Sequence, residues 1–340
     1  MSAESIPPPT RREVGAFPVI YHDESLYSVV ARFGHLTGYP DAASANLDLF
    51  DHDFGYAATA LPSNLDVLAL HLPAGLALTG SDLALRHTLF PYRTAFLTKA
   101  AAEESITRAR AKPDLQHLTP TRIVERPLPK PPGLRFCPEC HRDMKRSRQE
   151  LHWKRVHQLA IVTLCPDHKC DLRETSVSPA VGDKVLHLAS DELCGNDLPS
   201  VIPADTAVDR EVLLKLARQA RTLLEGKYPE GMTRKSGRDY AQLFRDLGYY
   251  RKDRLDWGRL LPDAQAAVAN IVAALPGLAT ISRDGMGWFA HAMSSNRPDH
   301  TDSVLITAMI ARTIKAVAPR FWASMDDATG QPLMPLASTA

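Results

Sequence analysis

The stretch that decides the fold begins with Phe136-Cys-Pro-Glu-Cys140 and ends, beyond an intervening loop, with Leu164-Cys-Pro-Asp-His168. In each half, two residues separate two possible metal ligands, and proline follows the first cysteine. A tetrahedral Zn²⁺ site needs this arrangement, because each short spacing lets two side chains point at one ion and the loop returns the second pair. Three thiolates and one imidazole fill all four positions. The pattern therefore predicts a structural zinc ion held by Cys137, Cys140, Cys165 and His168.

The fourth ligand is the open part of this prediction. His168 has the required spacing from Cys165, and we expect it to bind. The other residues near enough in the sequence to take its place are Cys170, His141, His152 and His157.

The insert between the two pairs changes character along its length. Its first half is dense in arginine and lysine, whereas its end, Leu159 to Leu164, is apolar and contains β-branched residues. This end is typical of a strand that leads into the second ligand pair, as in a zinc ribbon. We expect a further strand at Lys184 to Leu188 to complete the ribbon's sheet.

Several separated motifs now point to a known family. Around the ligand pairs stand Arg135-Phe-Cys-Pro-Glu-Cys140 and His152-Trp-Lys-Arg-Val-His-Gln-Leu159. Before them come Phe17-Pro-Val-Ile-Tyr-His-Asp-Glu-Ser-Leu-Tyr-Ser-Val-Val-Ala-Arg32, Leu61-Pro-Ser-Asn-Leu65 and His87-Thr-Leu-Phe-Pro-Tyr92. Over roughly residues 17–172 the chain resembles the TniQ/TnsD family, the target-selection proteins of a group of bacterial transposons.

The resemblance implies partners as well as a role. It implies a protein that engages target DNA and recruits an AAA+ ATPase of the TnsC type, which then brings in the transposase. Family members that read a fixed DNA site are generally longer, with further C-terminal DNA-binding helices. Engagement of a guide-RNA effector complex already on DNA therefore stays open beside direct DNA binding.

Positive charge is concentrated in one part of the chain. The net charge of the 340 residues is only +1, so any affinity for nucleic acid must come from a local patch. Between Arg108 and Arg155 the sequence holds thirteen basic residues against five acidic ones. The candidate phosphate-binding residues near the metal ligands are Arg142, Lys145, Arg146, Arg148, Lys154 and Arg155.

The five cysteines do not suit a disulfide framework, because three belong to the metal pattern and Cys170 and Cys194 remain. No stretch has the apolar length of a signal peptide core or a membrane span. We expect a soluble, cytoplasmic protein without a membrane partner.

The rest of the sequence predicts a mainly α protein with a small α+β zinc-ribbon module. Helical spacing of apolar residues predicts N-terminal helices at about 23–37, 41–50, 61–72, 82–91 and 92–110, as in a helix-turn-helix module. It also predicts C-terminal helices over about 209–224, 239–247, 257–275 and 301–317. The expected organisation is a disordered arm (1–16), the N-terminal helical domain (17–112), a Pro-rich linker (113–133), the zinc ribbon (134–207), the C-terminal helical domain (208–324) and a disordered tail (325–340).

The sequence favours one of three classes of function. We expect a non-enzymatic transposition adaptor, since a closed zinc site offers no open position for chemistry and no Walker-type phosphate loop is present. The alternative is a zinc-ribbon and helix-turn-helix transcription regulator unrelated to transposition. A zinc hydrolase or deaminase fits least, because the fourth ligand closes the site.

Overall fold

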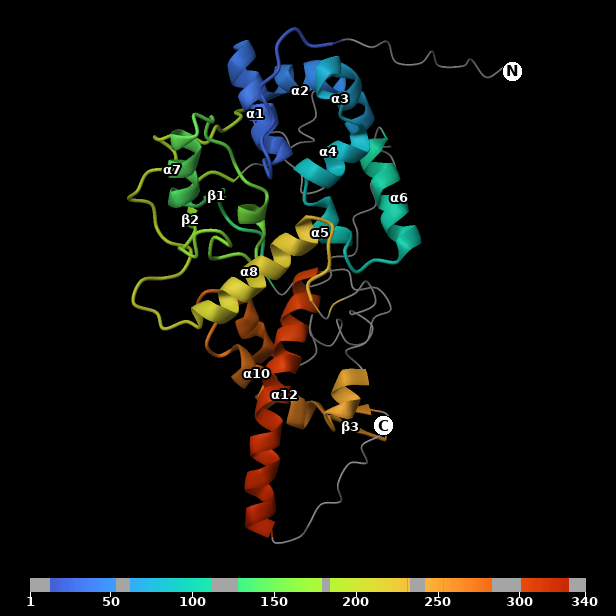
Figure 1. The fold of residues 1–340 in the computed structure, drawn as a ribbon, viewed down its shortest axis with the longest axis vertical. Coiled ribbons are helices and arrows are strands. Elements are labelled where there is room, and N and C mark those ends of the chain that lie inside the picture. Colours follow the sequence, from blue (N-terminus) through green and yellow to red (C-terminus); the bar gives the residue numbers. More distant parts are fainter. Residues whose placement is uncertain are drawn as a thin grey trace, which may run out of the picture.

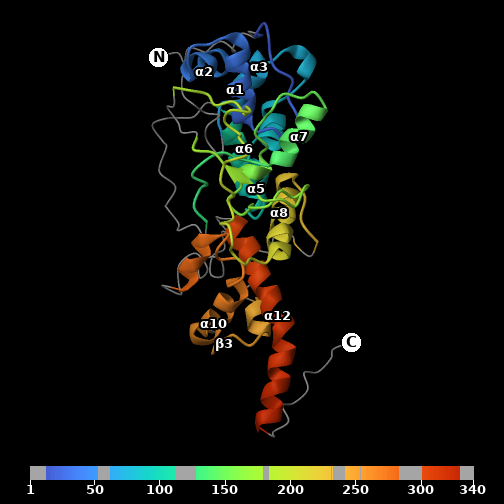
Figure 2. The same ribbon diagram turned by 90° about the vertical axis from the view of Figure 1, so that its left-hand side faces the viewer.

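The computed structural model describes residues 13–52, 62–111, 128–178, 184–230, 232, 242–252, 254–282 and 301–329; the side chains of 280–282 and 317–329 are not described. The chain is mainly helical, with two small two-stranded sheets. It is elongated: the N-terminal helices lie at one end with the predicted zinc segment (134–207) beside them, and the end of the last helix lies at the other (Figures 1 and 2).

The N-terminal part forms a bundle of short helices: α1 (Leu26–Thr37), α2 (Ala42–Phe50), α3 (Leu65–His71), η2 (Ala74–Leu76), α4 (Gly80–His87), α5 (Phe90–Thr94) and α6 (Lys99–Arg110). In four of them, a side chain before the helix accepts a hydrogen bond from the backbone N–H three residues later, which satisfies an otherwise unpaired donor. These capping residues are Ser25, Asp41, Thr79 and Thr98.

One predicted helix, 92–110, is wrong because the structure divides it into α5 and α6. The backbone of Thr98 is extended, with φ −61° and ψ 156°, and its hydroxyl caps α6 by accepting from the N–H of Ala101. Threonine competes for backbone donors in this way, which favours the start of a helix over its interior.

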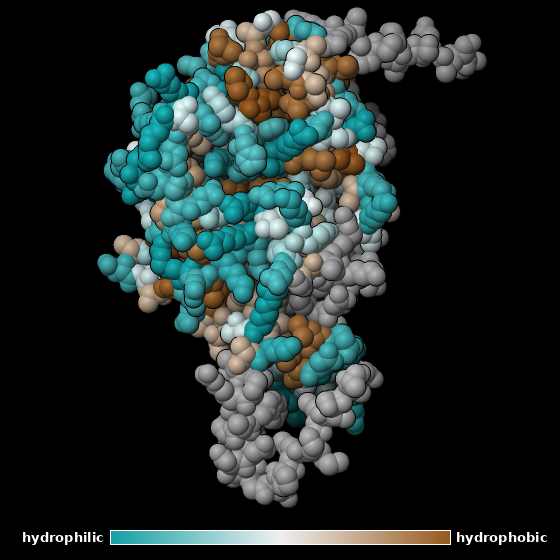
Figure 3. Space-filling view, viewed as in Figure 1, coloured by the Kyte–Doolittle hydropathy of each residue, from teal (hydrophilic) through white to brown (hydrophobic). Residues whose placement is uncertain are grey.

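The N-terminal helices enclose a core of their own, which includes Val30, Phe33, Leu49, Phe50, Leu65, Leu68 and Leu83. Val14, from the predicted disordered arm, is buried in this core, and its N–H donates to the carbonyl of His71 at 2.9 Å. The first twelve residues of that arm, and residues 113–127 of the predicted linker, lie outside the described residues. Apolar surface gathers over this end of the molecule, whereas the zinc segment and α8 present a mostly hydrophilic face (Figure 3).

The zinc segment contains β1 (Arg135–Phe136), α7 (Pro138–Arg146), η4 (Val156–Gln158) and β2 (Arg173–Glu174). The strands pair antiparallel, with Arg135 opposite Glu174 and Phe136 opposite Arg173, so a small ribbon joins the two ends of the segment.

Two predicted strands of this segment are wrong. Leu159 to Leu164 is a buried, irregular stretch after η4, with a single bridge from Leu164 to Asp171. Lys184 to Leu188 is not a strand either: the carbonyl of Lys184 accepts from Ala42, and the N–H of His187 donates to the Tyr27 hydroxyl. Here contacts with the N-terminal helices replace the expected strand pairing.

The C-terminal part consists of α8 (Arg210–Leu224), the hairpin β3 (Tyr250–Arg251) and β4 (Arg254–Leu255), α10 (Trp257–Val268), η5 (Pro276–Ser282) and α12 (Thr301–Thr329). The predicted helix over 257–275 ends at Val268, and the last helix continues beyond residue 317 into the first residues of the predicted tail. Of the helices described, none combines the length and the apolar character that crossing a membrane requires.

One large core runs from the zinc segment into these C-terminal helices. It includes Cys137, Cys140 and Cys165 together with apolar residues of α8, α10 and α12. The N-terminal helices join it through α5, where the Tyr92 hydroxyl donates to Asp302 at 2.5 Å. The zinc segment therefore packs against both the N-terminal and the C-terminal helices.

Two buried histidines at the junction of α1, α4 and the zinc segment predict a pH-dependent stability. Nδ1 of His87 donates to the carbonyl of Glu24 at 3.0 Å, and His152 stacks on Tyr21 with a ring separation of 4.8 Å. Burial lowers the pKa of each to about 4. Because each pKa lies below its unfolded value, the stability that each contributes is complete above about pH 6.5 and is lost as the pH falls toward 4.

We therefore expect the free energy of unfolding to fall over this window by about 1.4 kcal/mol per pH unit for each histidine. Urea denaturation between pH 7.5 and 4, at one fixed zinc concentration, measures the slope. His87→Gln keeps an amide that can bond the Glu24 carbonyl but cannot be protonated in this range, so its slope should be shallower by about one proton. Equal slopes for the two proteins would contradict this prediction.

Candidate metal centre

The four predicted ligands lie together in the structure. The His168 Nδ1 atom is 3.6 Å from Cys137 Sγ, 3.4 Å from Cys140 Sγ and 3.6 Å from Cys165 Sγ. Cys140 Sγ and Cys165 Sγ are 3.7 Å apart, and all four ligand atoms lie within 4.8 Å of one another. A zinc tetrahedron with Zn–S bonds of about 2.3 Å and a Zn–N bond of about 2.0 Å has edges of roughly 3.5–3.8 Å. The donor set and its spacing therefore fit a metal ion, and this cluster could hold one.

Local backbone structure positions each pair. Cys137 is the N-cap of α7 and Pro138 follows at the first helical position, where a missing N–H costs nothing. The Cys137 sulfur accepts from the N–H of Cys140 at 3.4 Å, and the Cys165 sulfur accepts from the N–H of His168 at 3.5 Å. Each pair thus forms the same turn, with the first sulfur bonded to the backbone of the second ligand.

Two of the three histidines that stood as alternatives to His168 stack on other rings, and the third, His157, lies outside the four clustered ligands. His141 stacks on Phe136 with a ring separation of 4.8 Å, and His152 stacks on Tyr21. His157 is buried in η4 beside Cys165. Cys170 remains close, with its sulfur 3.4 Å from Cys137 Sγ, but it is not one of the four clustered ligands.

His168 has a second partner that sequence reasoning missed. Its Nε2 lies 2.8 Å from Oδ2 of Asp143, a residue of α7. Burial works to lower the pKa of His168, but hydrogen bonds to Cys165 and Asp143 outweigh it and hold the pKa above its ordinary value. The signal was in the sequence: Asp143 follows Cys140 by three residues, so a helix from Pro138 places both on one face.

Two of the predicted phosphate-binding residues point into the protein. Arg155 is 5% exposed and donates to Asp23 and to the carbonyls of Leu85 and Thr88. Lys154 is half-buried, with its ammonium 3.7 Å from Asp167. Burial works to lower the pKa of Lys154, but the charges of Cys140 and Asp23 outweigh it and raise the pKa. Both residues bind protein groups and are not part of an open surface.

The other four, on and just after α7, are exposed: Arg142, Lys145, Arg146 and Arg148. The first three pair with carboxylates of Glu139, Asp191 and Asp143, respectively. These pairs are solvent-exposed, so each contributes less than about 1 kcal/mol and is open to exchange for another anion. The structure thus places a small basic surface along α7, which we call the α7 surface.

Two arginines of helix α8 form ion pairs with residues in and just after the second ligand turn, Cys165 to His168. Arg221 forms an ion pair with Asp167, and Arg210 forms one with Asp171 at 2.6 Å. Arg210 and Arg221 are eleven positions apart, about three helical turns, so both side chains lie on the same side of α8, which here faces the turn. The ligand turn and α8 are therefore one packed unit.

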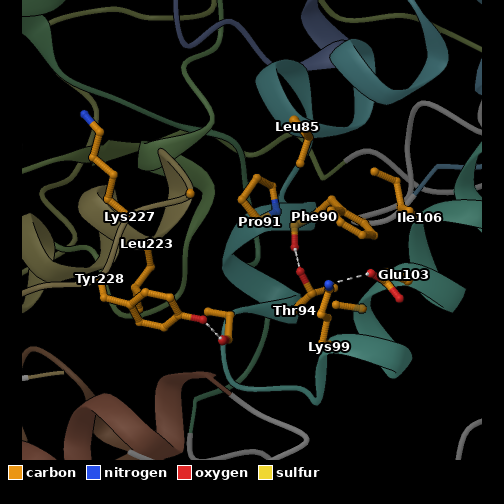
Figure 4. A pocket seen from close by; sticks show the side chains of 13 residues that line it. Leu85, Phe90, Pro91, Thr94, Lys99, Glu103, Ile106, Leu223, Lys227 and Tyr228 are labelled. Atoms are coloured by element: carbon orange, nitrogen blue, oxygen red, sulfur yellow. Dashed lines mark hydrogen bonds and ion pairs between the residues drawn. The ribbon is translucent and has the colours of Figure 1, made fainter. Parts of the chain in front are cut away.

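A separate groove of about 330 Å³ lies between α4, α5 and α6 and the end of α8 (Figure 4). Its walls are mostly apolar and include Leu85, Phe90, Pro91, Ile106 and Leu223. Lys99 and Lys227 extend at its edges, 3.7 Å from Glu103 and Glu225, respectively. Leu85 is 45% exposed, so this groove presents apolar side chains to solvent.

Comparison with known proteins shows a family match over the part of the chain that contains the candidate metal ligands. Residues 16–172 match the TniQ family model. The segment includes the N-terminal helices and all four candidate metal ligands and ends before α8.

The chain is also similar to the Transposon Tn7 transposition protein TnsD of Escherichia coli, with 27% identity over 152 residues. The similar stretch is 45% of this chain and 30% of that relative, so the chain spans about a third of the relative's length.

Proposed function

We propose that the protein is a non-catalytic transposition factor that engages target DNA, or a guide-RNA effector complex on DNA, and recruits an AAA+ ATPase of the TnsC type and the transposase. The observation that carries this proposal is the TniQ-family segment that contains the complete ligand cluster. Similarity to a transposition protein over the same part of the chain supports it.

The proposed metal is one Zn²⁺ ion with a structural role. Four protein ligands fill a tetrahedral zinc site and leave no position for a water or substrate. The sequence His22-Asp-Glu24 has the order of the histidine and glutamate of zinc deaminases. Glu24, however, is fully buried and accepts from Ser28 and Arg32, so it is engaged in holding the fold. These contacts support an adaptor over an enzyme.

The proposed contact with DNA is the α7 surface. Lysine and arginine side chains there bind phosphates by releasing counterions, which gives affinity without sequence choice. The exposed carboxylates beside three of the four cations weaken the surface, so we expect moderate affinity that depends strongly on salt.

The experiment is a salt titration of binding to duplex DNA by fluorescence anisotropy. The triple variant Lys145→Gln, Arg146→Gln, Arg148→Gln should bind more weakly, and the slope of log K against log salt should flatten by up to about three units, roughly one per lost phosphate contact. The matched control Lys252→Gln, Arg254→Gln, Lys315→Gln removes the same charge from exposed positions of the hairpin and α12. Equal slopes in the two triple variants would exclude the α7 surface as the contact.

A protein partner requires a different kind of surface. Interface centres are apolar and poor in charged residues. The groove in Figure 4 has this character and joins the TniQ-family segment to α8, which supports recruitment of a protein partner by this chain.

A further inference from the structure

The metal cluster has five possible ligands for four positions. Cys137, Cys140 and Cys165 supply three thiolates, and either His168 or Cys170 could complete the tetrahedron. Cys170 is half-buried, its sulfur is 3.4 Å from Cys137 Sγ, and its carbonyl accepts from the N–H of Cys165 at 2.8 Å. Both residues belong to the same turn, and zinc accepts Cys₄ as well as Cys₃His sites. Some other group must therefore decide between them.

Asp143 lies where it can favour His168 over Cys170 as the fourth ligand. Its Oδ2 lies 2.8 Å from His168 Nε2, while Nδ1 on the other side of the ring faces the three sulfurs at 3.4–3.6 Å. An outer carboxylate of this kind fixes the orientation of a metal-bound imidazole and makes it a stronger ligand. Because Asp143 is on α7, the helix that begins at Cys137 and carries Cys140, the carboxylate is held in register with the first ligand pair.

The net charge of the zinc cluster also favours His168 over Cys170 as the fourth ligand. A Zn²⁺ ion with three thiolates and a neutral imidazole has a net charge of −1, whereas four thiolates give −2. The Asp143 carboxylate would repel a further thiolate, and the half-buried cation Lys154 is shared with Asp167. A nearby negative charge therefore favours the neutral ligand.

We propose that Asp143 is a positioning residue that selects His168 over Cys170 as the fourth zinc ligand, and that Cys170 takes the position when the bond from Asp143 is lost. This inference rests on the zinc site proposed above. It adds that Asp143, which is not itself a ligand, determines which fourth residue binds the zinc ion, and that the Cys170 thiolate can replace His168.

Zinc K-edge X-ray absorption of the zinc-loaded chain tests this directly. The wild type should show three sulfurs at about 2.3 Å and one nitrogen at about 2.0 Å. Asp143→Ala should keep its zinc but shift to four sulfurs. Asp143→Asn retains an oxygen that accepts from His168 and should keep the wild-type ligand set. Arg146→Gln, which removes the other ion pair of Asp143 (3.3 Å) without touching His168, is the matched control and should leave the spectrum unchanged.

Chelator competition provides a second measurement. In Asp143→Ala combined with Cys170→Ser, no fourth thiolate is available, and zinc affinity should fall by roughly 10- to 100-fold, more than in either single variant. Three sulfurs and one nitrogen in Asp143→Ala, four sulfurs in the wild type, or complete loss of zinc from Asp143→Ala would each overturn the inference. A wild-type chain that binds no zinc would instead overturn the proposed metal site itself.

Discussion

Replacing Cys137 with serine should release the zinc ion and unfold the segment between β1 and β2. Cys137 is fully buried, its sulfur caps α7, and it lies against Cys170 and His168. In small zinc modules, metal binding contributes on the order of 10 kcal/mol to folding. The segment shares its core with α8, and Arg221 and Arg210 tie α8 to the second ligand turn. Loss of the ion should therefore loosen the C-terminal helices as well.

Metal analysis and thermal denaturation measure this result. We expect about one zinc ion per chain in the wild type and none in Cys137→Ser, with a melting temperature lower by at least about 10 °C. Cys194→Ser is the matched control, because Cys194 is a buried cysteine outside the ligand cluster. A Cys137→Ser protein that retained its zinc and its melting temperature would show that the ligand set is wrong.

Sequence reasoning predicted which four residues cluster because their spacing is a local property. Two residues between paired ligands determine a turn, and the turn determines where the side chains point. The same reasoning was wrong for Leu159 to Leu164, because a short apolar run indicates burial without distinguishing a strand from any other buried stretch. In the structure this run contributes Ile161, Val162 and Leu164 to the core shared with α8.

The basic residues show a second limit of sequence reasoning. Lys154 and Arg155 were assigned to a phosphate surface because they lie in a basic stretch, but Arg155 is buried against Asp23, 132 positions earlier. Counting charge along the chain does not reveal partners so distant in sequence. The contact of His168 with Asp143 joins residues 25 positions apart, and only the helical spacing of Asp143 from Cys140 indicated it in the sequence.

The second large effect concerns the buried ion pair that holds α1 against the zinc segment. The Arg32 guanidinium donates to both carboxylate oxygens of Glu24, at 3.1 and 3.0 Å, and also to Glu150 of the zinc segment. Glu24 further accepts from Ser28, whose hydroxyl oxygen accepts from the N–H of Trp153 at 3.1 Å. Glu24 is completely buried and Arg32 is 4% exposed, so water cannot replace either partner.

Glu24→Ala should therefore destabilise the fold by about 3–5 kcal/mol, the cost of leaving one member of a buried pair without the other. Glu150→Gln is the matched control: Glu150 bonds the same guanidinium from an exposed position, and exposed pairs contribute less than about 1 kcal/mol. Urea denaturation of the three zinc-loaded proteins gives the comparison. Similar losses in the two variants would mean that Arg32 is held by its surface partner and that Glu24 is dispensable.

Burial raises the pKa of the Glu24 carboxyl even though Arg32 lies beside it, so the attraction does not fully offset the loss of hydration. An apolar replacement of both residues, Glu24→Leu with Arg32→Met, should therefore restore much of the stability lost in Glu24→Ala. It would not restore the bond that fixes Ser28, which accepts from Trp153 of the zinc segment, or the bond to Glu150 of that segment. Hydrogen exchange at the amide of Trp153 should then be faster in the double variant than in the wild type at equal global stability, because Ser28 is no longer fixed by Glu24. Unchanged exchange at the Trp153 amide would show that Glu24 and Arg32 contribute only packing. The surrounding apolar contacts would then hold α1 against the zinc segment.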